Sequence, residues 1–348
     1  VTVVSSSFKK HYINYVNGVK VCYINNENIY WGFDQKNESA LKKVIWHTLD
    51  TYNFRLEKKI IKILETEKPE IIHTNNLSSF SVIVWRIAQK RGISTIHSLR
   101  DYYLACPSAV MYKNGNNCLN QCFSCKFFSL IKKKLSVSVS SVVGISNYIL
   151  QKHLELGYFE NVENKEVRGN DVSVPTVNKK KLFCKTKIVF GFIGQLNESK
   201  GIIQLLKTFK NFESFNNWKL LIAGKGNADF TNSIKQEFGS ERIDFVGVVD
   251  SEIFYNEIDV LIVPSLWQEP FGRVVIEGIQ NGKYVLASRR GGITELLMED
   301  DLYEPNSNEL FEKIEPILRT AIIPEQRNKF RADAASKYLG LYQKMLAL

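Results

Sequence analysis

Two glutamates, Glu269 and Glu277, stand eight residues apart around a Pro-Phe-Gly step. If the span were helical, a rise of about 1.5 Å per residue would place the two carboxylates about 12 Å apart. That distance is too long for an acid pair that shares one proton. It suits the two ends of one polyhydroxylated ligand, because an ionised carboxylate accepts hydrogen bonds from neighbouring hydroxyls. Backbone N–H groups near Phe271 and Gly272 would lie at a helix start, where an anion is stabilised.

The elements that must position this motif follow a regular pattern in the second half of the chain. An apolar run at 259–264 predicts a buried parallel strand directly before Glu269, and a helical pattern continues from the motif through Ile279. Further strands alternating with helices are predicted at 187–194, 218–224, 243–247 and 283–288. This alternation predicts an α/β fold with a parallel sheet and helices on both faces. Ligands of such sheets bind outside the carboxyl ends of the strands.

The stretch Glu269-Pro270-Phe271-Gly272, with Glu277, resembles the donor-site motif of family 4 retaining glycosyltransferases of the bacterial surface-polysaccharide type. The resemblance implies the GT-B fold, in which two Rossmann-like doubly wound domains face a central cleft. It also implies a hexosyltransferase that moves a sugar from a nucleotide-diphosphate donor, a UDP-sugar in preference to a GDP-sugar. The acceptor would be a hydroxyl of a glycan or lipid-linked glycan, and the anomeric configuration would be retained.

The resemblance assigns catalytic roles to Glu269, His97 and Lys200. The residues it assigns to the donor are Gly194, Gln195, Lys200, Gly224, Phe271, Gly272, Arg273 and Glu277. The family usually has Arg where this chain has Gln195, so Lys200 must carry more of the interaction with the diphosphate, and Arg273 is a candidate substitute. A structural histidine is the alternative for His97, as a solvated surface lysine is for Lys200.

Three residues of the first half are candidates for the acceptor side. His73 and Asn75 end a predicted strand, and Ser146 stands between a predicted strand and helix, where related enzymes line their cleft. The alternative for the first two is a turn held by side-chain amides, and the alternative for Ser146 is a helix cap.

The 348 residues suffice for two domains. We expect an N-terminal acceptor-binding domain at 1–176 and a nucleotide-sugar-binding domain at 177–327, with the linker near 175–181. A final helix at 328–348 should cross back to the first domain, as in the family. The family's first strand, Gly-rich loop and helix have no counterpart before Val1 in this sequence.

Four cysteines lie within an insert at 106–125: Cys106, Cys118, Cys122 and Cys125. Four thiolates suit a closed tetrahedral zinc site that would hold a loop with little core of its own. The alternative is four reduced thiols that pack as small apolar groups. No Asp-x-Asp motif occurs, so no metal or other cofactor is expected in catalysis.

Residues 1–175 carry 23 Lys and Arg against 14 Asp and Glu, whereas the remainder is nearly neutral. Phe127 and Phe128 stand beside Lys126 and the lysines at 132–134, as in an interfacial segment with a basic flank. An ordinary amphipathic helix that covers the core is the alternative. No apolar run approaches the roughly 20 residues that span a bilayer. We therefore expect a cytoplasmic protein, peripheral at the inner face of the cell membrane.

Other functions fit the sequence less well. An epimerase or phosphorylase on the same scaffold is a second enzymatic reading. An inactive transferase-like subunit, or a membrane-docking partner protein, is the alternative from another class. Nucleic acid is not an expected partner, because no basic motif interleaved with aromatic residues accompanies the positive charge.

Overall fold

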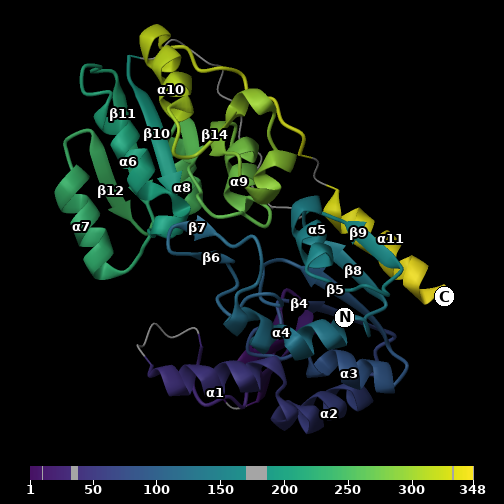
Figure 1. Cartoon of the computed structure of the whole chain (residues 1–348). Coiled ribbons are helices and arrows are strands. Elements are labelled where there is room, and N and C mark those ends of the chain that lie inside the picture. The colour runs from purple at the N-terminus through teal and green to yellow at the C-terminus, as the bar shows by residue number, and fades with distance from the viewer. Residues whose placement is uncertain (10, 33–37, 170–185, 331–332, 348) are drawn as a thin grey trace. The chain divides into compact units, whose positions relative to one another are not determined.

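The computed structural model describes residues 1–9, 11–32, 38–169, 186–330 and 333–347 (Figure 1). The chain divides into two compact units. Unit 1 comprises Val1–Met111, Cys118–Gly169 and Ala335–Leu348, and unit 2 comprises Tyr112–Asn117 and Asn170–Ala334. The linker expected at 175–181 lies outside the described residues.

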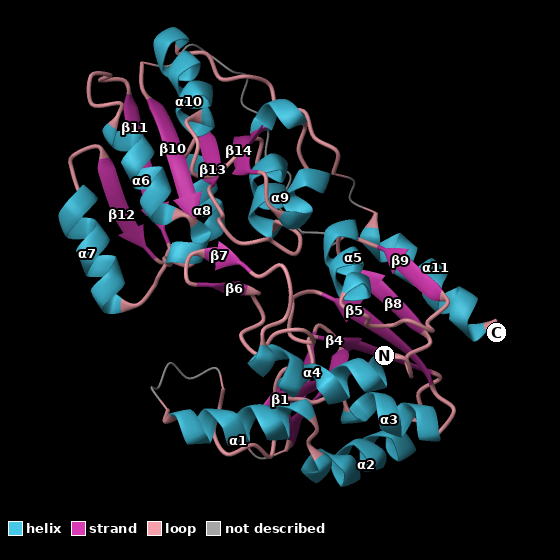
Figure 2. Cartoon of the chain, in the orientation of Figure 1, coloured by secondary structure: helices cyan, strands magenta, loops and turns pink. Residues whose placement is uncertain are grey.

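Unit 2 contains a six-stranded sheet in which every neighbouring pair is parallel (Figure 2). Its strands are β10 (Ile188–Ile193), β11 (Trp218–Ala223), β12 (Ile243–Gly247), β13 (Val260–Val263), β14 (Tyr284–Ser288) and β15 (Leu302–Tyr303). Their order is β12-β11-β10-β13-β14-β15, so the direction of winding reverses between β10 and β13. In doubly wound sheets this reversal opens a crevice for a ligand at the carboxyl ends of the two central strands.

Helices accompany this sheet: α6 (Ile202–Lys210), α7 (Ala228–Phe238), α8 (Ser251–Glu257), α9 (Arg273–Gln280) and α10 (Glu309–Thr320). Short 3₁₀ turns occur at η2 (Glu198–Lys200), η3 (Gly291–Glu295) and η4 (Glu299–Asp301). The Phe209 ring of α6 lies 5.1 Å from Phe190 of β10 and 5.1 Å from Trp218 of β11, measured between ring centroids. The central strands read as continuous apolar runs because both faces of a parallel sheet are covered.

Unit 1 has a four-stranded parallel sheet in the order β4-β5-β8-β9. These strands are β4 (Ile71–Asn75), β5 (Ser94–Leu99), β8 (Ser141–Gly144) and β9 (Asn164–Val167). A second sheet, in the order β1-β3-β2, consists of β1 (Thr2–Ser7), β2 (Tyr12–Val16) and β3 (Val19–Asn25). The helices of unit 1 are α1 (Ala40–Thr51), η1 (Phe54–Leu56), α2 (Glu57–Glu67), α3 (Ile83–Lys90), α4 (Phe123–Ser136), α5 (Asn147–Glu155) and α11 (Ala334–Leu346).

Two segments belong to a different unit from the residues next to them in the sequence. The hairpin of β6 (Tyr112–Lys113) and β7 (Asn116–Asn117) is part of unit 2, although unit 1 residues flank it. Helix α11 packs in unit 1, where Leu341 and Met345 contact Ile96 and Val143. It begins later than the expected residue Asn328, which instead forms a β-bridge with Leu297.

Within the described ranges, no helix combines the length and apolar character needed to cross a membrane.

Candidate active site

Two candidate residues meet at the point where the winding of unit 2 reverses. Lys200 ends the η2 turn in the loop after β10, and Glu269 lies in the loop after β13. The Lys200 Nζ atom donates to Glu269 Oε1 over 2.6 Å. Because β10 and β13 are neighbours in the sheet, the sequence separation of 69 residues brings no separation in space. A cation and a carboxylate therefore share the end of the sheet where a ligand is expected.

Three donors converge on a single oxygen of Glu269. Besides Lys200, Ser265 Oγ donates to Oε1 over 2.7 Å and Trp267 Nε1 donates over 2.8 Å. The Lys200 ammonium also lies 4.9 Å from the centre of the Trp267 ring, within the range of a cation–π contact. Glu269 is only 8% exposed, and a buried carboxylate requires such partners. Since all three described donors reach Oε1, Oε2 is the oxygen that can accept from a ligand hydroxyl.

Glu277 lies one turn into α9 and is held at both oxygens. Arg273 Nε donates to Oε1 over 3.1 Å, and the Tyr255 hydroxyl donates to Oε2 over 3.2 Å. Burial is the main reason why the Tyr255 pKa lies above its ordinary value, and the neighbouring Glu277 carboxylate raises it further. The phenol therefore remains a donor at neutral pH. The helix begins only at Arg273, so the condition under which a separation of about 12 Å was estimated for the two carboxylates is not met.

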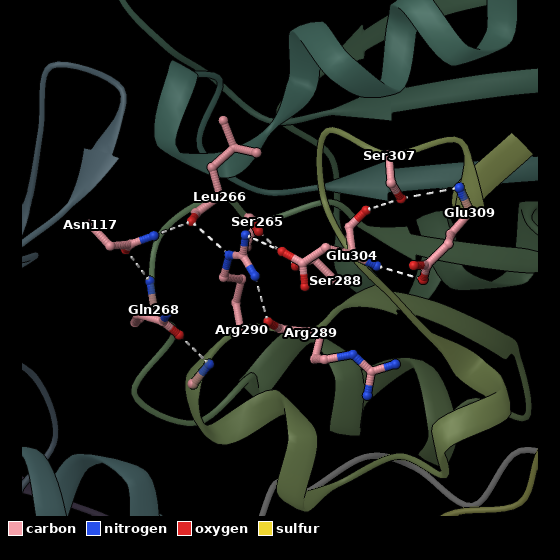
Figure 3. A network of polar contacts seen from close by, with 11 residues as sticks. Asn117, Ser265, Leu266, Gln268, Ser288, Arg289, Arg290, Glu304, Ser307 and Glu309 are labelled. Carbon is pink, nitrogen blue, oxygen red and sulfur yellow. Dashed lines mark hydrogen bonds and ion pairs between the residues drawn. The ribbon is translucent and has the colours of Figure 1, made fainter. Parts of the chain in front are cut away.

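Distant parts of unit 2 hold the loop that carries Glu269 (Figure 3). Asn117 of the β6–β7 hairpin donates from Nδ2 to the Leu266 carbonyl over 2.8 Å and accepts from Gln268 N over 2.9 Å. Gln268 Oε1 in turn accepts from Gly291 N over 2.6 Å. Arg290 donates to the Leu266 carbonyl and forms a 2.6 Å ion pair with Glu304. Trp267 and Glu269, which contact Lys200, are thus positioned by hydrogen bonds to the backbone of Leu266 and Gln268.

Glycines allow neighbouring backbones to approach the same loop closely. At Gly291, with φ of 54°, a Cβ atom would lie 2.2 Å from the Glu269 carbonyl oxygen. At Gly201, with φ of 73°, it would lie 1.8 Å from the Pro264 carbonyl oxygen. Both positions combine a left-handed backbone with no room for a side chain, so only glycine fits them.

The remaining donor-side candidates have different surroundings. Gly194 and Gly224 lie together, since a Cβ on Gly224 would be 1.7 Å from the Gly194 carbonyl oxygen. Gln195 is exposed, and Phe271 is buried. Gly272, with φ of 100°, is the residue from which α9 starts, and no side chain of the described residues caps that end of the helix. A helix start therefore lies at Gly272, within the stretch where the sequence placed one.

His97 lies in the core of unit 1. Its ring packs against Trp85 and Phe159, its Nδ1 lies 2.9 Å from Thr74 Oγ1, and it is only 3% exposed. Burial, with smaller contributions from neighbouring charged groups, lowers its pKa to about 3. The ring is neutral at physiological pH, and its described contacts match those of a structural histidine, the alternative set out for it from the sequence.

The three acceptor-side candidates also have structural contacts in unit 1. His73 anchors α11, because its Nδ1 lies 2.6 Å from the Tyr342 hydroxyl and its Nε2 lies 2.8 Å from Ser98 Oγ. Asn75 is exposed and accepts from Arg100 Nε over 2.8 Å. Ser146 is buried and caps α5 by accepting from Ile149 N over 3.1 Å.

The structure does not support the zinc site expected at the four clustered cysteines. No group of three or more His, Cys, Asp or Glu side chains in the described part of the chain is placed to hold a metal ion. Cys106 is buried and Cys122 is exposed at the start of α4. Each of these two thiols lies near a serine hydroxyl, and Cys125 contacts both of them. Burial and the neighbouring Cys106 thiol raise the pKa of Cys125 well above its ordinary value.

Sequence reasoning missed several residues of this site. Ser265 and Trp267 directly follow the carboxyl end of β13, so their position after a buried strand was an available signal. Asn117 lies 149 residues from Leu266, and no local pattern connects the two.

Comparison with known proteins identifies the family of the chain. The sequence model of the family described as "Glycosyl transferases group 1" matches residues 174–337. An uncharacterised 42.6 kDa protein in the cps region of Klebsiella pneumoniae is 39% identical over 285 residues, which are 80% of this chain and 73% of that protein. A lipopolysaccharide 1,2-N-acetylglucosaminetransferase of Salmonella typhimurium is 30% identical over 168 residues, 43% of each chain.

Solved structures show the same fold. The HepE protein of Anabaena, crystallised with UDP and glucose, superposes with a TM-score of 0.67 at 16% identity, over 95% of this chain and 87% of that one. Sucrose-phosphate synthase of Thermosynechococcus elongatus gives a TM-score of 0.69 at 18% identity, over 96% and 85% of the two chains. The fold and the site thus define a glycosyltransferase with the GT-B fold, which confirms the fold expected from the sequence. The chain belongs to the glycosyl transferase group 1 family.

Substituting Gly291 by Ala should destabilise unit 2 more than substituting Gly282. Both have positive φ, 54° and 69°, but a Cβ on Gly282 meets nothing within 4 Å. Gly282→Ala should therefore cost only the left-handed backbone, about 1–2 kcal/mol. Gly291→Ala should cost about 1–3 kcal/mol more, because the Glu269 backbone must move. Urea unfolding measures both, and equal losses would show that the loop yields without strain.

Acid should destabilise the protein below pH 6.5. Burial lowers the pKa of His73 to about 4, of His97 to about 3 and of His153 to about 4. The unfolded chain therefore binds protons first as the pH falls from 6.5 towards 4, and the free energy of unfolding decreases. Burial also lowers the pKa of the less buried His47 to about 4, which adds to this trend. Burial raises the pKa of Asp50 to about 6 and raises those of Asp101 and Asp301, which opposes it.

At pH 5.5 the net loss should be on the order of 3 kcal/mol, from about 1.4 kcal/mol per pH unit and histidine. Thermal unfolding between pH 7.5 and pH 5.5, at about 0.15 M salt, measures it. His73→Gln keeps a polar partner for Tyr342 but does not titrate, so it should reduce the pH dependence by roughly a third of the three-histidine sum. A midpoint that does not change with pH would contradict the assignment of neutral buried histidines.

Proposed function

We propose that this protein transfers a hexose from a UDP-sugar to a hydroxyl of a glycan or lipid-linked glycan, with retention at the anomeric carbon and without a metal ion. A GDP-sugar is the second choice of donor. The observation that carries the proposal is the 2.6 Å contact between Lys200 and the buried Glu269 at the carboxyl ends of β10 and β13. A cation for a diphosphate and a carboxylate for sugar hydroxyls are thereby set side by side.

In the proposed reaction the bond between the anomeric carbon and the diphosphate oxygen breaks, and the acceptor oxygen bonds to the same face of the sugar. The acceptor hydroxyl proton passes to the departing diphosphate oxygen. Lys200 and the positive end of the α9 dipole stabilise the negative charge that develops on the leaving group. Glu269 accepts from the hydroxyls of the transferred sugar through Oε2 and fixes its orientation.

Glu277 is proposed to bind the ribose hydroxyls of the donor. Arg273 is 74% exposed at its side chain, so it can turn away from Glu277 or reach a phosphate while Tyr255 keeps the carboxylate in place. Gln195 supplies no charge at the position where the family usually has Arg. The preference for uridine draws support from the fold neighbour HepE, which was crystallised with UDP and with UDP-glucose.

The acceptor class is proposed from two relatives. One is encoded in a cps region and the other is a lipopolysaccharide N-acetylglucosaminetransferase, so both names point to bacterial surface polysaccharides. We accordingly place the reaction in the cytoplasm, at the inner face of the cell membrane, where a lipid-linked glycan would be presented. The proposed acceptor-side residues are His73, Asn75 and Ser146, and His97 acts by supporting the strand end between them rather than as a proton donor.

Calorimetric titration with UDP and GDP tests the donor site. UDP should bind, and Glu277→Gln should weaken it about 10- to 100-fold, the equivalent of one or two hydrogen bonds to a charged group. Glu269→Gln should leave UDP affinity within about threefold but abolish transfer, followed as UDP release with a UDP-sugar and a glycan lipid extract. Glu252→Gln, on the exposed side of α8, is the matched control and should change neither.

The outcomes separate the alternatives. Binding of GDP alone would change the donor base and keep the site. Folded protein that binds neither nucleotide would refute the transferase proposal and favour the inactive subunit. Inverted anomeric configuration of the product, read by NMR, would refute the retaining mechanism alone.

A further inference from the structure

Helix α4 in unit 1 buries its polar side and exposes its apolar side. Its buried residues are Ser129, Lys132 and Ser136, whereas Phe123, Phe127 and Leu130 are 88%, 58% and 63% exposed. At about 3.6 residues per turn these three apolar residues fall on one stripe of the helix. Ile131 extends the stripe and is also exposed. A helix that covers a core has the opposite distribution, so that alternative from the sequence does not hold for α4.

Helix α1 has a second exposed apolar stripe. Leu41, Val44 and Ile45 are exposed and lie at helical spacing on one side. The opposite side buries Trp46 and Asp50. Two neighbouring helices of unit 1 therefore each present apolar side chains outward.

The two helices lie side by side (Figure 1). Thr51 of α1 donates to the Phe128 carbonyl of α4 over 3.0 Å, and the His47 and Phe128 rings are 5.5 Å apart. Their buried sides converge on Tyr103, whose hydroxyl donates to the Asp50 carbonyl and whose own carbonyl accepts from Lys132 Nζ. Since both inner faces point to one residue, the two stripes point away from it together. We call this surface the α1–α4 face.

The charge on this surface is positive. Helix α4 contains four lysines and no aspartate or glutamate. The exposed lysines of the two helices are Lys42, Lys43, Lys126, Lys133 and Lys134. Of the acids of α1 and its approach, Asp50 is buried and Glu38 is paired with Lys42 over 3.1 Å. The basic flank expected at 132–134 is thus corrected, because Lys132 is buried and only the other two lysines reach the surface.

We propose that the α1–α4 face docks onto a membrane surface that contains anionic phospholipid. Apolar stripes flanked by lysines match a bilayer boundary, where side chains enter the acyl region and the ammonium groups meet headgroup phosphates. A nucleic acid would leave the apolar stripes without a partner. A second copy of the chain would bring two lysine-rich faces together, because an isologous contact pairs like with like. Docking rests on this surface alone and not on the proposed transfer of sugar.

Sedimentation with vesicles tests the proposal. The protein should bind vesicles of phosphatidylcholine with phosphatidylglycerol much more strongly than vesicles of phosphatidylcholine alone. Phe127→Ser with Leu130→Ser should abolish binding. Lys133→Gln with Lys134→Gln should weaken it at least about tenfold, and added salt should do the same to the unchanged protein.

Matched controls in unit 2 remove the same groups elsewhere. Val248 and Ile253 are exposed apolar residues, and Lys187 and Lys207 are exposed lysines. Val248→Ser with Ile253→Ser, and Lys187→Gln with Lys207→Gln, should leave vesicle binding unchanged. All four double variants should keep the thermal midpoint and the UDP affinity of the unchanged protein, so that loss of docking is distinguished from loss of the donor site.

Three results would overturn the proposal. The first is no binding of the unchanged protein to anionic vesicles. The second is equal binding of all variants. The third is a dimer in light scattering that Phe127→Ser with Leu130→Ser dissociates, without any vesicle binding, which would assign the α1–α4 face to a second copy.

Discussion

The site depends on one buried carboxylate. Glu269 is withdrawn from solvent, and an ionised group in that position is tolerated only where charged and polar donors replace its water. The lysine comes from the loop after one strand, and the serine and tryptophan come from the loop after another. These donors can reach one carboxylate only because β10 and β13 are neighbours in the sheet. In the sequence, 66 residues separate the end of β10 from the start of β13. The strand order is therefore the physical condition for the chemistry at the sheet end.

A loop that carries such a group must itself be rigid, since small displacements change hydrogen-bond lengths and the electrostatic work of burial. The structure meets this need through the backbone. Asn117 bonds to both sides of Trp267, and Ser288 Oγ donates to the Ser265 carbonyl over 2.7 Å. Gly291 and Gly201 let two further segments lie against the loop at contact distance. The hairpin that supplies Asn117 therefore stabilises the Glu269 loop of unit 2, although the residues before and after the hairpin belong to unit 1.

The sequence was informative where apolar residues formed a regular pattern or where a motif followed a predicted strand. The apolar runs of unit 2 predicted its parallel sheet, and the resemblance carried by the Glu269 motif assigned roles to Lys200 and Glu269. Asn117 escaped because a contact between residues so distant in sequence has no period. The zinc hypothesis is not supported in the described residues, because the spacing of four cysteines alone does not fix whether their sulfur atoms take a tetrahedral arrangement. Lys132 was assigned to the surface because a run of three lysines conceals which of them points to the core.

The burial of Lys132 explains why the apolar side of α4 is exposed. Burial lowers the pKa of Lys132 to about 8, while Asp50 and Asp101 favour its charged form. The ammonium also lies 3.5 Å from the centre of the Tyr103 ring and donates to the Tyr103 carbonyl. These contacts fix which side of α4 faces inward, and Ser129 and Ser136 on the same side have hydrogen-bond partners of their own. Because polar groups occupy the inner side, the phenylalanine and leucine side chains of α4 have no place in the core. Their exposure follows from a satisfied polar interior, and it persists in the folded state as an apolar surface that a partner can cover.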